Sequence, residues 1–398
     1  MTPLRTITDA LHQCAEIGQA TVLATVVRVV GSSYGGVGTR MVVRVDGTTV
    51  GIVSGGCLES DLAGHARRVH ESGRAEVVSY DTRADDDAVW GLGLGCNGLI
   101  DVLLEPLPPN HAAAVASLLA TALDADAPRV LATVIHVDAS ASGAPAVGAH
   151  ALLDGDDART TGAWGDGRAL AAAHANAGDA FGAGRGGLVR ETDGVRLAFE
   201  VVAPTVELLI CGSGPDAVPV ARLATQLGWD VTVVDHRPVE HAHPERFPGA
   251  RVAECADAAR LGDYVPLRAR TAAVVMSHHF ARDADYLHAL LAARPQPSST
   301  AGVAYVGVLG PRSRTERMLA ELASRGAPAG SPAVDARLHG PIGLDVGGDG
   351  PEAIALSIIA EVSAVVHGRE GGFLRDRRAP LHAPPHAPAA RAMTHDAR

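Results

Sequence analysis

The sequence has few aromatic side chains and no excess of positive charge, and both shortages narrow the range of functions. Phe, Trp and Tyr make up 3% of the 398 residues, whereas glycine contributes 45. The formal net charge is −11 and no basic stripe appears, so the chain is not expected to bind nucleic acid or an anionic membrane. The composition is that of an ordinary globular α/β protein.

Long apolar runs and paired cysteines are also missing. No apolar run reaches membrane-spanning length, and the N-terminus lacks the apolar stretch of a signal peptide. We therefore expect a cytoplasmic protein. The cysteines are odd in number and none has zinc-site spacing, which argues against a disulfide framework and a structural zinc site. They are Cys14, Cys57, Cys96, Cys211 and Cys255.

The length of the chain predicts two domains followed by a tail. Residues 1–203 predict a mixed α+β N-terminal domain, with a proline-rich break near residues 106–109. Strands alternate with helices over residues 204–373, which predicts a Rossmann-like, doubly wound parallel sheet. Residues 374–398 are predicted to be a disordered tail. The expected fold class is therefore α/β.

Local patterns outline the N-terminal domain. They predict an opening amphipathic helix, a buried strand over residues 21–30, a hairpin turn at Asp46 and Gly47, and a helix from about Leu58 to Gly73. Residues 111–203 are expected to hold a helix, a strand over residues 129–137, a flexible Ala/Ser/Gly stretch and a further strand pair.

The clearest motif is GSGPDA at residues 212–217, which follows a predicted strand and opens a predicted helix, as a dinucleotide-binding turn does. Gly212 would permit the tight turn, and Gly214 would let a phosphate approach the backbone at the helix N-terminus. Asp235 ends the next strand, where it could accept hydrogen bonds from two ribose hydroxyls. The ligand stays open, because such a turn serves any phosphate-bearing molecule and can also be purely structural.

Two cysteines are framed by glycines. Cys57 follows Gly55 and Gly56 at a predicted strand-to-helix turn, where the helix dipole lowers the pKa of a thiol. A thiolate there can ligate a soft metal or carry a persulfide, and the glycines leave room for a bulky ligand. Cys96 lies in the glycine-rich segment GLGCNG at residues 93–98. Small structural cysteines beside tight turns would explain the same pattern.

Polar residues also follow two later strands of the second domain. His278 lies in MSHHFARD at residues 276–283, at the carboxyl end of a strand, where Rossmann folds bind ligands. It could act as a general base, a phosphate donor or a metal ligand. Arg312 and Arg314 stand at a helix start and suit an anionic ligand. Helix capping and solvated side chains are the alternative explanation.

Taken together, these motifs resemble the XdhC/CoxI family, the accessory proteins of xanthine dehydrogenase and related molybdenum hydroxylases. The resemblance covers roughly residues 5–375. The matching segments are residues 31–33, 54–59, 90–98, 212–217, 228–238, 276–283, 305–314, 339–361 and 368–372. In one respect the chain departs from the family. The segment after Gly-Ser-Ser is often basic and contains proline, whereas here it is Tyr-Gly-Gly-Val-Gly at residues 34–38. If those basic residues meet a phosphate in the family, we expect a phosphate to bind this chain less tightly at this segment, or to bind at another place.

The resemblance implies a chaperone that binds molybdenum cofactor and hands it to an apo-xanthine dehydrogenase or a related hydroxylase. It also implies that a cysteine desulfurase donates sulfur for the molybdenum. No catalytic residue is assigned, Cys57 is the candidate molybdenum contact, and a homodimer stays open. The residues expected to contact the cofactor are Cys57, Cys96, Gly55, Gly56, Glu59, Gly212, Gly214, Asp235, His278 and Arg312.

Two other functions remain open at this point. The Rossmann domain could serve an NAD(P)- or other nucleotide-dependent oxidoreductase, although the first domain offers no obvious hydride-acceptor site. Alternatively, the chain could be an interaction scaffold with a vestigial Rossmann fold. The motifs favour a cofactor chaperone over a catalyst, and the sequence does not identify the client enzyme.

Overall fold

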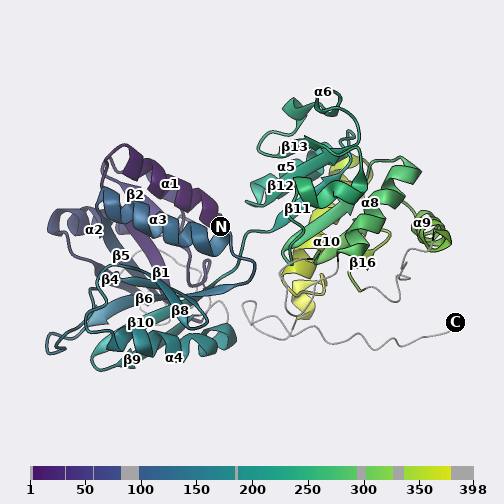
Figure 1. Cartoon of the computed structure of the whole chain (residues 1–398). Coiled ribbons are helices and arrows are strands. Elements are labelled where there is room, and N and C mark those ends of the chain that lie inside the picture. The colour runs from purple at the N-terminus through teal and green to yellow at the C-terminus, as the bar shows by residue number, and fades with distance from the viewer. Residues whose placement is uncertain are drawn as a thin grey trace. The chain divides into compact units, whose positions relative to one another are not determined.

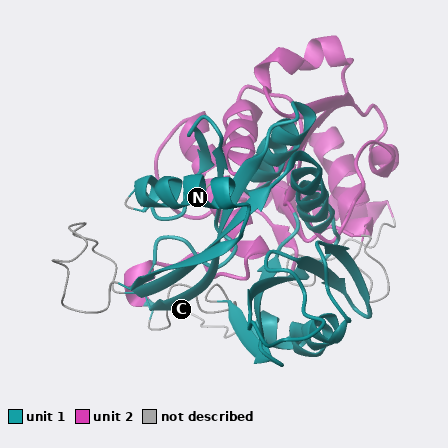
Figure 2. Ribbon diagram, turned by 90° about the vertical axis from the view of Figure 1, so that its left-hand side faces the viewer, with its two compact units in different colours: residues 1–204, 377–384 teal, residues 205–376, 385–398 magenta. Residues whose placement is uncertain are grey.

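The chain divides into two units, whose main segments are Met1–Pro204 and Thr205–Asp376 (Figure 2). The computed structural model describes residues 3–31, 33–56, 58–81, 98–183, 187–293, 302–325 and 336–377. Each unit is built around its own sheets and is described separately. Within these described ranges, no helix is both long enough and apolar enough to cross a membrane.

The first unit contains the same succession of elements twice (Figure 1). Each copy has a helix, three strands, a second helix and two strands. The first copy comprises α1 (Leu4–Glu16), β1 (Thr21–Gly31), β2 (Arg40–Arg44), β3 (Thr49–Gly51), α2 (Glu59–Ser72), β4 (Glu76–Asp81) and β5 (Gly98–Leu107). The second comprises α3 (Pro109–Leu123), β6 (Arg129–Val137), β7 (His150–Asp154), β8 (Asp157–Thr161), α4 (Arg168–Ala183), β9 (Leu188–Thr192) and β10 (Val195–Val202).

The two copies also share their sheet topology. Each forms a five-stranded sheet, of order β3-β2-β1-β5-β4 in the first copy and β8-β7-β6-β10-β9 in the second. The long central pair of each sheet is antiparallel and carries one register irregularity. The sequence repeats faintly as well, because LATVVRV at residues 23–29 corresponds to LATVIHV at residues 131–137. The unit is therefore an internal duplication. The sequence repeat is too faint for the duplication to have been predicted from the residues.

One buried ion pair and one buried histidine–carboxylate pair join the two copies reciprocally. Arg40 of β2 pairs with Glu200 of β10, and His150, at the equivalent position of β7, pairs with Glu105 of β5. The His150 Nε2 lies 2.9 Å from the Glu105 Oε1, and none of the four side chains is more than 10% exposed. Because each pair crosses from one sheet to the other, the pairs fix how the two copies pack.

Apolar side chains fill the layers on both sides of each sheet. Helix α2 covers the outer face of the first sheet and α4 that of the second, whereas α1 and α3 pack together against both sheets. A smaller cluster lies between the sheets, formed by Val27, Leu103, Ile135 and Ala198. Strand alternation produces this arrangement, since successive side chains point to opposite faces.

Most of the expected elements of this unit are present, and one helix is new. The hairpin at Asp46 and Gly47 joins β2 to β3, and α2 ends at Gly73 in the left-handed conformation, with φ 64°. Helix α4 is not among the elements that the sequence pattern predicted for residues 111–203. The residues that α4 buries are Ala169, Ala173 and Ala180. Alanine on both faces gives little apolar contrast, so the helical periodicity was hidden.

The second unit is a six-stranded sheet of order β13-β12-β11-β14-β15-β16, with every pair parallel. Its strands are β11 (Glu207–Cys211), β12 (Asp230–Asp235), β13 (Arg251–Glu254), β14 (Thr271–Val275), β15 (Tyr305–Val308) and β16 (Leu338–His339). Its α-helices are α5 (Ala217–Gln226), α6 (Val239–Ala242), α7 (Leu261–Tyr264), α8 (Phe280–Ala292), α9 (Arg312–Ser324) and α10 (Pro351–Val366). Short 3₁₀ turns occupy Pro244–Arg246, Ala258–Arg260 and Leu374–Asp376.

Helices cover both faces of this parallel sheet. Side chains of α5 and α10 pack on one face, and those of α8 and α9 pack on the other. The predicted doubly wound, Rossmann-like sheet is therefore confirmed. The strand order reverses between β11 and β14, and the carboxyl ends of these two strands border the crevice in which such sheets bind ligands.

Candidate functional site

Glycine-rich loops of the first copy converge at one end of its sheet. The ring of Tyr34, in the loop after β1, lies 3.3 Å from the point where a Cβ on Gly55 would stand. Gly31, the last residue of β1, pairs with Gly98, the first residue of β5. The loop over residues 33–39 therefore adjoins the loop over residues 53–56, and β5 begins at the end of the sheet where β1 ends.

Glu59 holds the second of these loops in shape. Its carboxylate accepts hydrogen bonds from the backbone N–H groups of Val53 (2.9 Å), Ser54 (2.8 Å) and Gly56 (2.9 Å), and from the Ser54 hydroxyl (2.8 Å). Burial would raise the pKa of this carboxyl, but the hydrogen bonds from Ser54 and Val53 outweigh it and lower the pKa below its ordinary value. The predicted cofactor residue thus organises the loop with oxygens that already have protein donors.

Gly55 and Gly56 adopt backbone angles that side chains disfavour, with φ of 81° and 114°. Glu59 is the first residue of α2, so its negative charge also suits the helix N-terminus. Cys57 and Cys96 lie outside the described residues, as do residues 90–97 of the matching segment 90–98. Within the described ranges, no group of three or more His, Cys, Asp or Glu side chains could hold a metal ion.

In the Rossmann unit, the glycines of GSGPDA first serve packing. Gly212 has a φ of 124°, and a Cβ on it would stand 2.5 Å from the Cα of Ser277. The missing side chain therefore lets the loop after β11 approach the loop after β14. A Cβ on Gly214 would stand 2.7 Å from the Oδ1 of Asp216, the residue that precedes α5.

Asp235 is 2% exposed and bonds to the same loop. Its Oδ2 accepts from the Ser213 N–H (3.0 Å), the Ser213 hydroxyl (2.6 Å) and an Arg237 amino group (2.9 Å). Its Oδ1 accepts from the Arg237 backbone N–H and Nε, both at 2.9 Å. Burial would raise the pKa of Asp235, yet the bonds from Arg237 and Ser213 hold it far below its ordinary value. Little accepting capacity is left for a ribose hydroxyl pair.

His278 stands at the carboxyl edge of the sheet beside this turn. Its Nε2 lies 2.6 Å from the Oδ2 of Asp216, its side chain is 61% exposed, and its Cδ2 is 3.7 Å from the Cβ position of Gly214. The residue has a φ of 61°, a conformation that costs energy for any residue but glycine. The structure thus brings Gly212, Gly214 and His278 together at the edge where Rossmann folds bind ligands.

Arg312 is exposed at the start of α9, and its neighbour Arg314 makes the structural contact. An amino group of Arg314 lies 2.7 Å from the Oδ2 of Asp283. The Oδ1 of Asp283 accepts from the Ser277 backbone N–H and hydroxyl, at 3.0 and 2.5 Å. Asp283 therefore anchors the loop after β14 as Asp235 anchors the loop after β11.

Glu59 and Asp235 were expected from the sequence to contact a ligand rather than to anchor loops, and the role of Glu361 of α10 was not predicted. Glu361 accepts from the Tyr305 hydroxyl (2.6 Å) and the Gly343 N–H (2.8 Å), and its Oε1 lies 3.1 Å from the Nδ1 of His339. It therefore holds the segment HGPIG at residues 339–343 in place. In the sequence, the serine or glycine of each loop is the visible sign of such an anchor. The acidic partner cannot be identified there, because it lies on a helix or strand outside the loop.

The chain is similar in sequence and in structure to known proteins over most of its length. A model of the XdhC Rossmann domain matches residues 208–362, and a model of the XdhC and CoxI family matches residues 14–81. A solved structure from Bacillus halodurans, described as a xanthine dehydrogenase, aligns with a TM-score of 0.69 and 30% identity over 91% of this chain and 96% of that chain. The chain belongs to the XdhC and CoxI family.

This member of the XdhC and CoxI family is also similar in sequence to two bacterial proteins with descriptive names. It is 28% identical to a Bacillus subtilis protein described as a probable xanthine dehydrogenase subunit, over 90% of this chain and 96% of that protein. It is 34% identical to the molybdenum cofactor insertion chaperone PaoD of Escherichia coli, over 26% of this chain and 31% of that protein. The N-terminal family match ends at residue 81, inside the first copy of the duplication, so it includes the loops around Tyr34 and Glu59.

Proposed function

We propose that this protein is an accessory factor that binds molybdenum cofactor and assists its insertion into an apo-xanthine dehydrogenase or a related molybdenum hydroxylase. The observation that carries the proposal is the meeting of the glycine loops of the first copy, where Tyr34 adjoins Gly55 and Gly31 pairs with Gly98. The relative that is named as a molybdenum cofactor insertion chaperone supports the same cargo.

The chemistry of the cargo suits this end of the sheet. Molybdenum cofactor carries a metal bound by two sulfurs of a pterin, and soft thiolate ligands suit such sites. Cys57, between Gly56 and the start of α2, is the proposed first contact, and Cys96 the second. Glu59 positions the loop before Cys57 through its hydrogen bonds to Val53, Ser54 and Gly56.

The proposal also covers sulfuration of the molybdenum, the cellular location and the roles of the two domains. Sulfuration of the molybdenum would use a cysteine desulfurase as sulfur donor, and the exchange would take place in the cytoplasm. We propose residues 1–203 as the domain that holds the metal end of the cargo and residues 204–373 as a second binding domain, with the ligand of the latter facing Gly214 and His278. Recognition of an NAD ribose by Asp235 is disfavoured, because its oxygens are occupied by Ser213 and Arg237.

The test is the pterin content of the purified protein. We would express the full chain in a molybdenum-replete host, oxidise the denatured protein and measure pterin fluorescence. We expect bound pterin in the native protein and a loss of at least roughly tenfold in Cys57→Ala, since a metal contact outweighs a single hydrogen bond. Cys14→Ala, which removes the buried thiol of α1, is the matched control. Native protein that carries no pterin and binds none in titration would contradict the proposal.

A further inference from the structure

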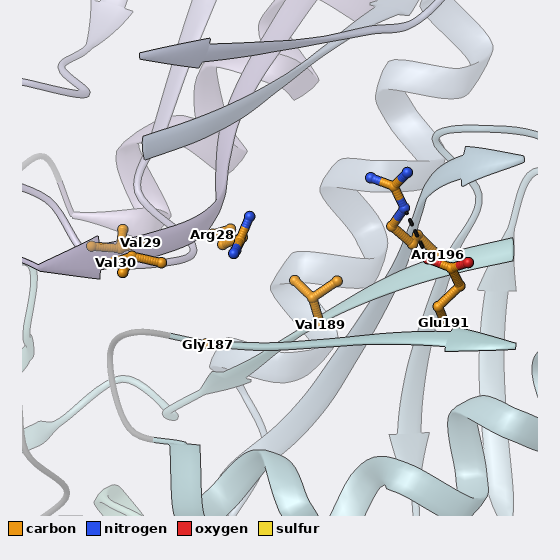
Figure 3. A pocket seen from close by; sticks show the side chains of 7 residues that line it. All are labelled: Arg28, Val29, Val30, Gly187, Val189, Glu191 and Arg196. Carbon is orange, nitrogen blue, oxygen red and sulfur yellow. Dashed lines mark ion pairs between the residues drawn. The ribbon is translucent and has the colours of Figure 1, made fainter. Parts of the chain in front are cut away.

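A cavity of about 480 Å³ opens between the two sheets of the first unit. Figure 3 shows its two walls, one from the end of β1 and the other from β9 and β10. Its lining residues are Arg28, Val29, Val30, Gly187, Val189, Glu191 and Arg196. This volume is in the range of small-molecule sites, and its lining combines apolar walls with a few charged groups, as such sites do.

A β-bulge aims one arginine into this cavity. The register between β1 and β5 shifts between Val26 and Arg28, so Val27 is the extra residue. Val27 belongs to the cluster between the sheets, and the bulge puts the following residue, Arg28, on the same side. Bulges commonly redirect a side chain next to a functional site. Without the bulge, alternation would turn Arg28 toward the outer face covered by α2.

The second arginine reaches the cavity by ordinary alternation. On β10, Ala198 belongs to the cluster between the sheets, and Arg196, two residues earlier, shares that face. On β9, Val189 and Glu191 line the cavity. Arg190 lies between them and points the other way, where its guanidinium pairs with Asp179 of α4 at 3.1 Å.

Among the described residues, the partners of the two cavity arginines are held loosely. Arg28 lies 3.5 Å from Asp101 and is 49% exposed, and Arg196 lies 3.3 Å from Glu191 and is 48% exposed. Exposed pairs of this kind contribute little stability, so an anionic ligand can displace the carboxylates. Two guanidinium groups suit a phosphate, which accepts paired hydrogen bonds from arginine.

The lining of the cavity adjoins one loop of the proposed cargo site. Val30 lines it and directly precedes Gly31, where the first glycine loop begins. Val37 of that loop packs on Gly187, whose missing Cβ would stand 2.6 Å from a Val37 methyl. The loop itself carries no basic residue between Tyr34 and Gly38, so a phosphate near it must find its cations elsewhere.

We infer that the cavity binds the phosphate-bearing end of the pterin cargo, through Arg28 of β1 and Arg196 of β10. This inference rests on the proposed function, and it adds which group of the cargo is bound and by which side chains. Val30 and Val189 form the apolar walls against which the adjoining part of the ligand packs. Glu191 competes with the phosphate for Arg196.

The test compares two probes on the full chain, 6-hydroxymethylpterin and its monophosphate, titrated by pterin fluorescence. We expect native protein to bind the monophosphate at least roughly tenfold more tightly, as two charge-assisted contacts allow. Arg28→Gln and Arg196→Gln should each remove most of that preference and leave binding of the unphosphorylated pterin unchanged. Glu191→Gln should increase the preference. Arg190→Gln, on the opposite face of β9, is the matched control and should change neither affinity.

The outcomes separate the two proposals. If the native protein binds both probes equally, or if both arginine variants keep the preference, the phosphate site is wrong while the cofactor-binding function stands. If neither probe binds and inorganic phosphate does not protect Arg28 or Arg196 from arginine-specific modification, the phosphate site is wrong. The proposed function fails with it only if the purified chain also carries no pterin. Loss of the preference in the two arginine variants alone would support the site.

Discussion

At the scale of single residues, the loops at both candidate sites are held by buried or half-buried carboxylates. Ser54, Ser213 and Ser277 each donate a backbone N–H and a hydroxyl to one acidic side chain, from Glu59, Asp235 and Asp283 respectively. The same device occurs in both units. A carboxylate that accepts several N–H bonds stabilises an otherwise open loop, so these acids position the sites without needing to touch a ligand.

The Asp235→Asn variant tests this device. Because an amide cannot accept all the donors of Ser213 and Arg237, we expect the free energy of unfolding of the Rossmann unit to fall by about 2–3 kcal/mol. The pKa of Asp235 is depressed in the folded protein, so its stabilisation is present above the ordinary pKa and is lost as the pH falls below about 4. Native protein should lose stability over that acidic range, and the variant should lose less of it.

Urea unfolding at several pH values measures both effects. Asp349→Asn, at an exposed position before α10, is the matched control, with an expected change within about 0.5 kcal/mol. An unfolding free energy for Asp235→Asn equal to that of native protein at neutral pH would show that the five hydrogen bonds to Asp235 do not stabilise the unit.

At the scale of elements, the sequence predicted the strands and helices well where their apolar periodicity was strong. The hairpin β2–β3, the alternation of β11 to α10 and the glycine stop of α2 all follow from local patterns. Helix α4 did not, since its buried residues are alanines. The pairing of β1 with β5 and of β6 with β10 also escaped prediction, because strand partners are chosen by the whole sheet.

The reciprocal buried pairs between these elements give a second stability prediction. Arg40→Ala leaves Glu200 buried without its partner, so we expect a loss of about 3–5 kcal/mol in the unfolding free energy of the first unit. The double variant Arg40→Met with Glu200→Leu removes both charges and should recover most of that loss, because desolvation of the pair is then avoided. Urea unfolding of the full chain, followed in the first unit, measures both.

A surface pair supplies the control for this experiment. Arg5 and Asp124 lie 3.3 Å apart with side chains 36% and 61% exposed, so Arg5→Ala should cost about 1 kcal/mol or less. If Arg40→Ala costs no more than Arg5→Ala, the ion pair to Glu200 does not hold the two copies together.

At the scale of the whole molecule, the two copies of the first unit share a fold but differ in their cysteines and in one connecting segment. The first copy carries Cys57 and Cys96, whereas residues 109–202 contain no cysteine. The strands β9 and β10 are joined by a tight turn at Asp193 and Gly194, where the first copy has the segment 82–97 between β4 and β5. The second copy therefore completes the packing and the cavity, and the loops that we propose to bind the cargo belong to the first copy.

This asymmetry predicts the stoichiometry of the cargo. We expect no more than one pterin per chain at saturation, because the sequence of the second copy has no cysteine that corresponds to Cys57 or Cys96. Pterin fluorescence against protein concentration, with mass spectrometry of the intact complex under native conditions, gives the ratio. Two pterins per chain, both retained in Cys57→Ala, would mean that the second copy binds cargo independently.

The fold class, the Rossmann sheet, the motif segments and the family resemblance could all be inferred from the amino-acid sequence, because each depends on residues close together in the chain. Tertiary structure decided the duplication, the roles of the anchoring acids and the cavity between the sheets. Arg40 and Glu200, for example, lie 160 positions apart, and no local pattern links them. Long-range partners are selected by the packing of complete sheets, so which side chain meets which could be known only once the sheets were assembled.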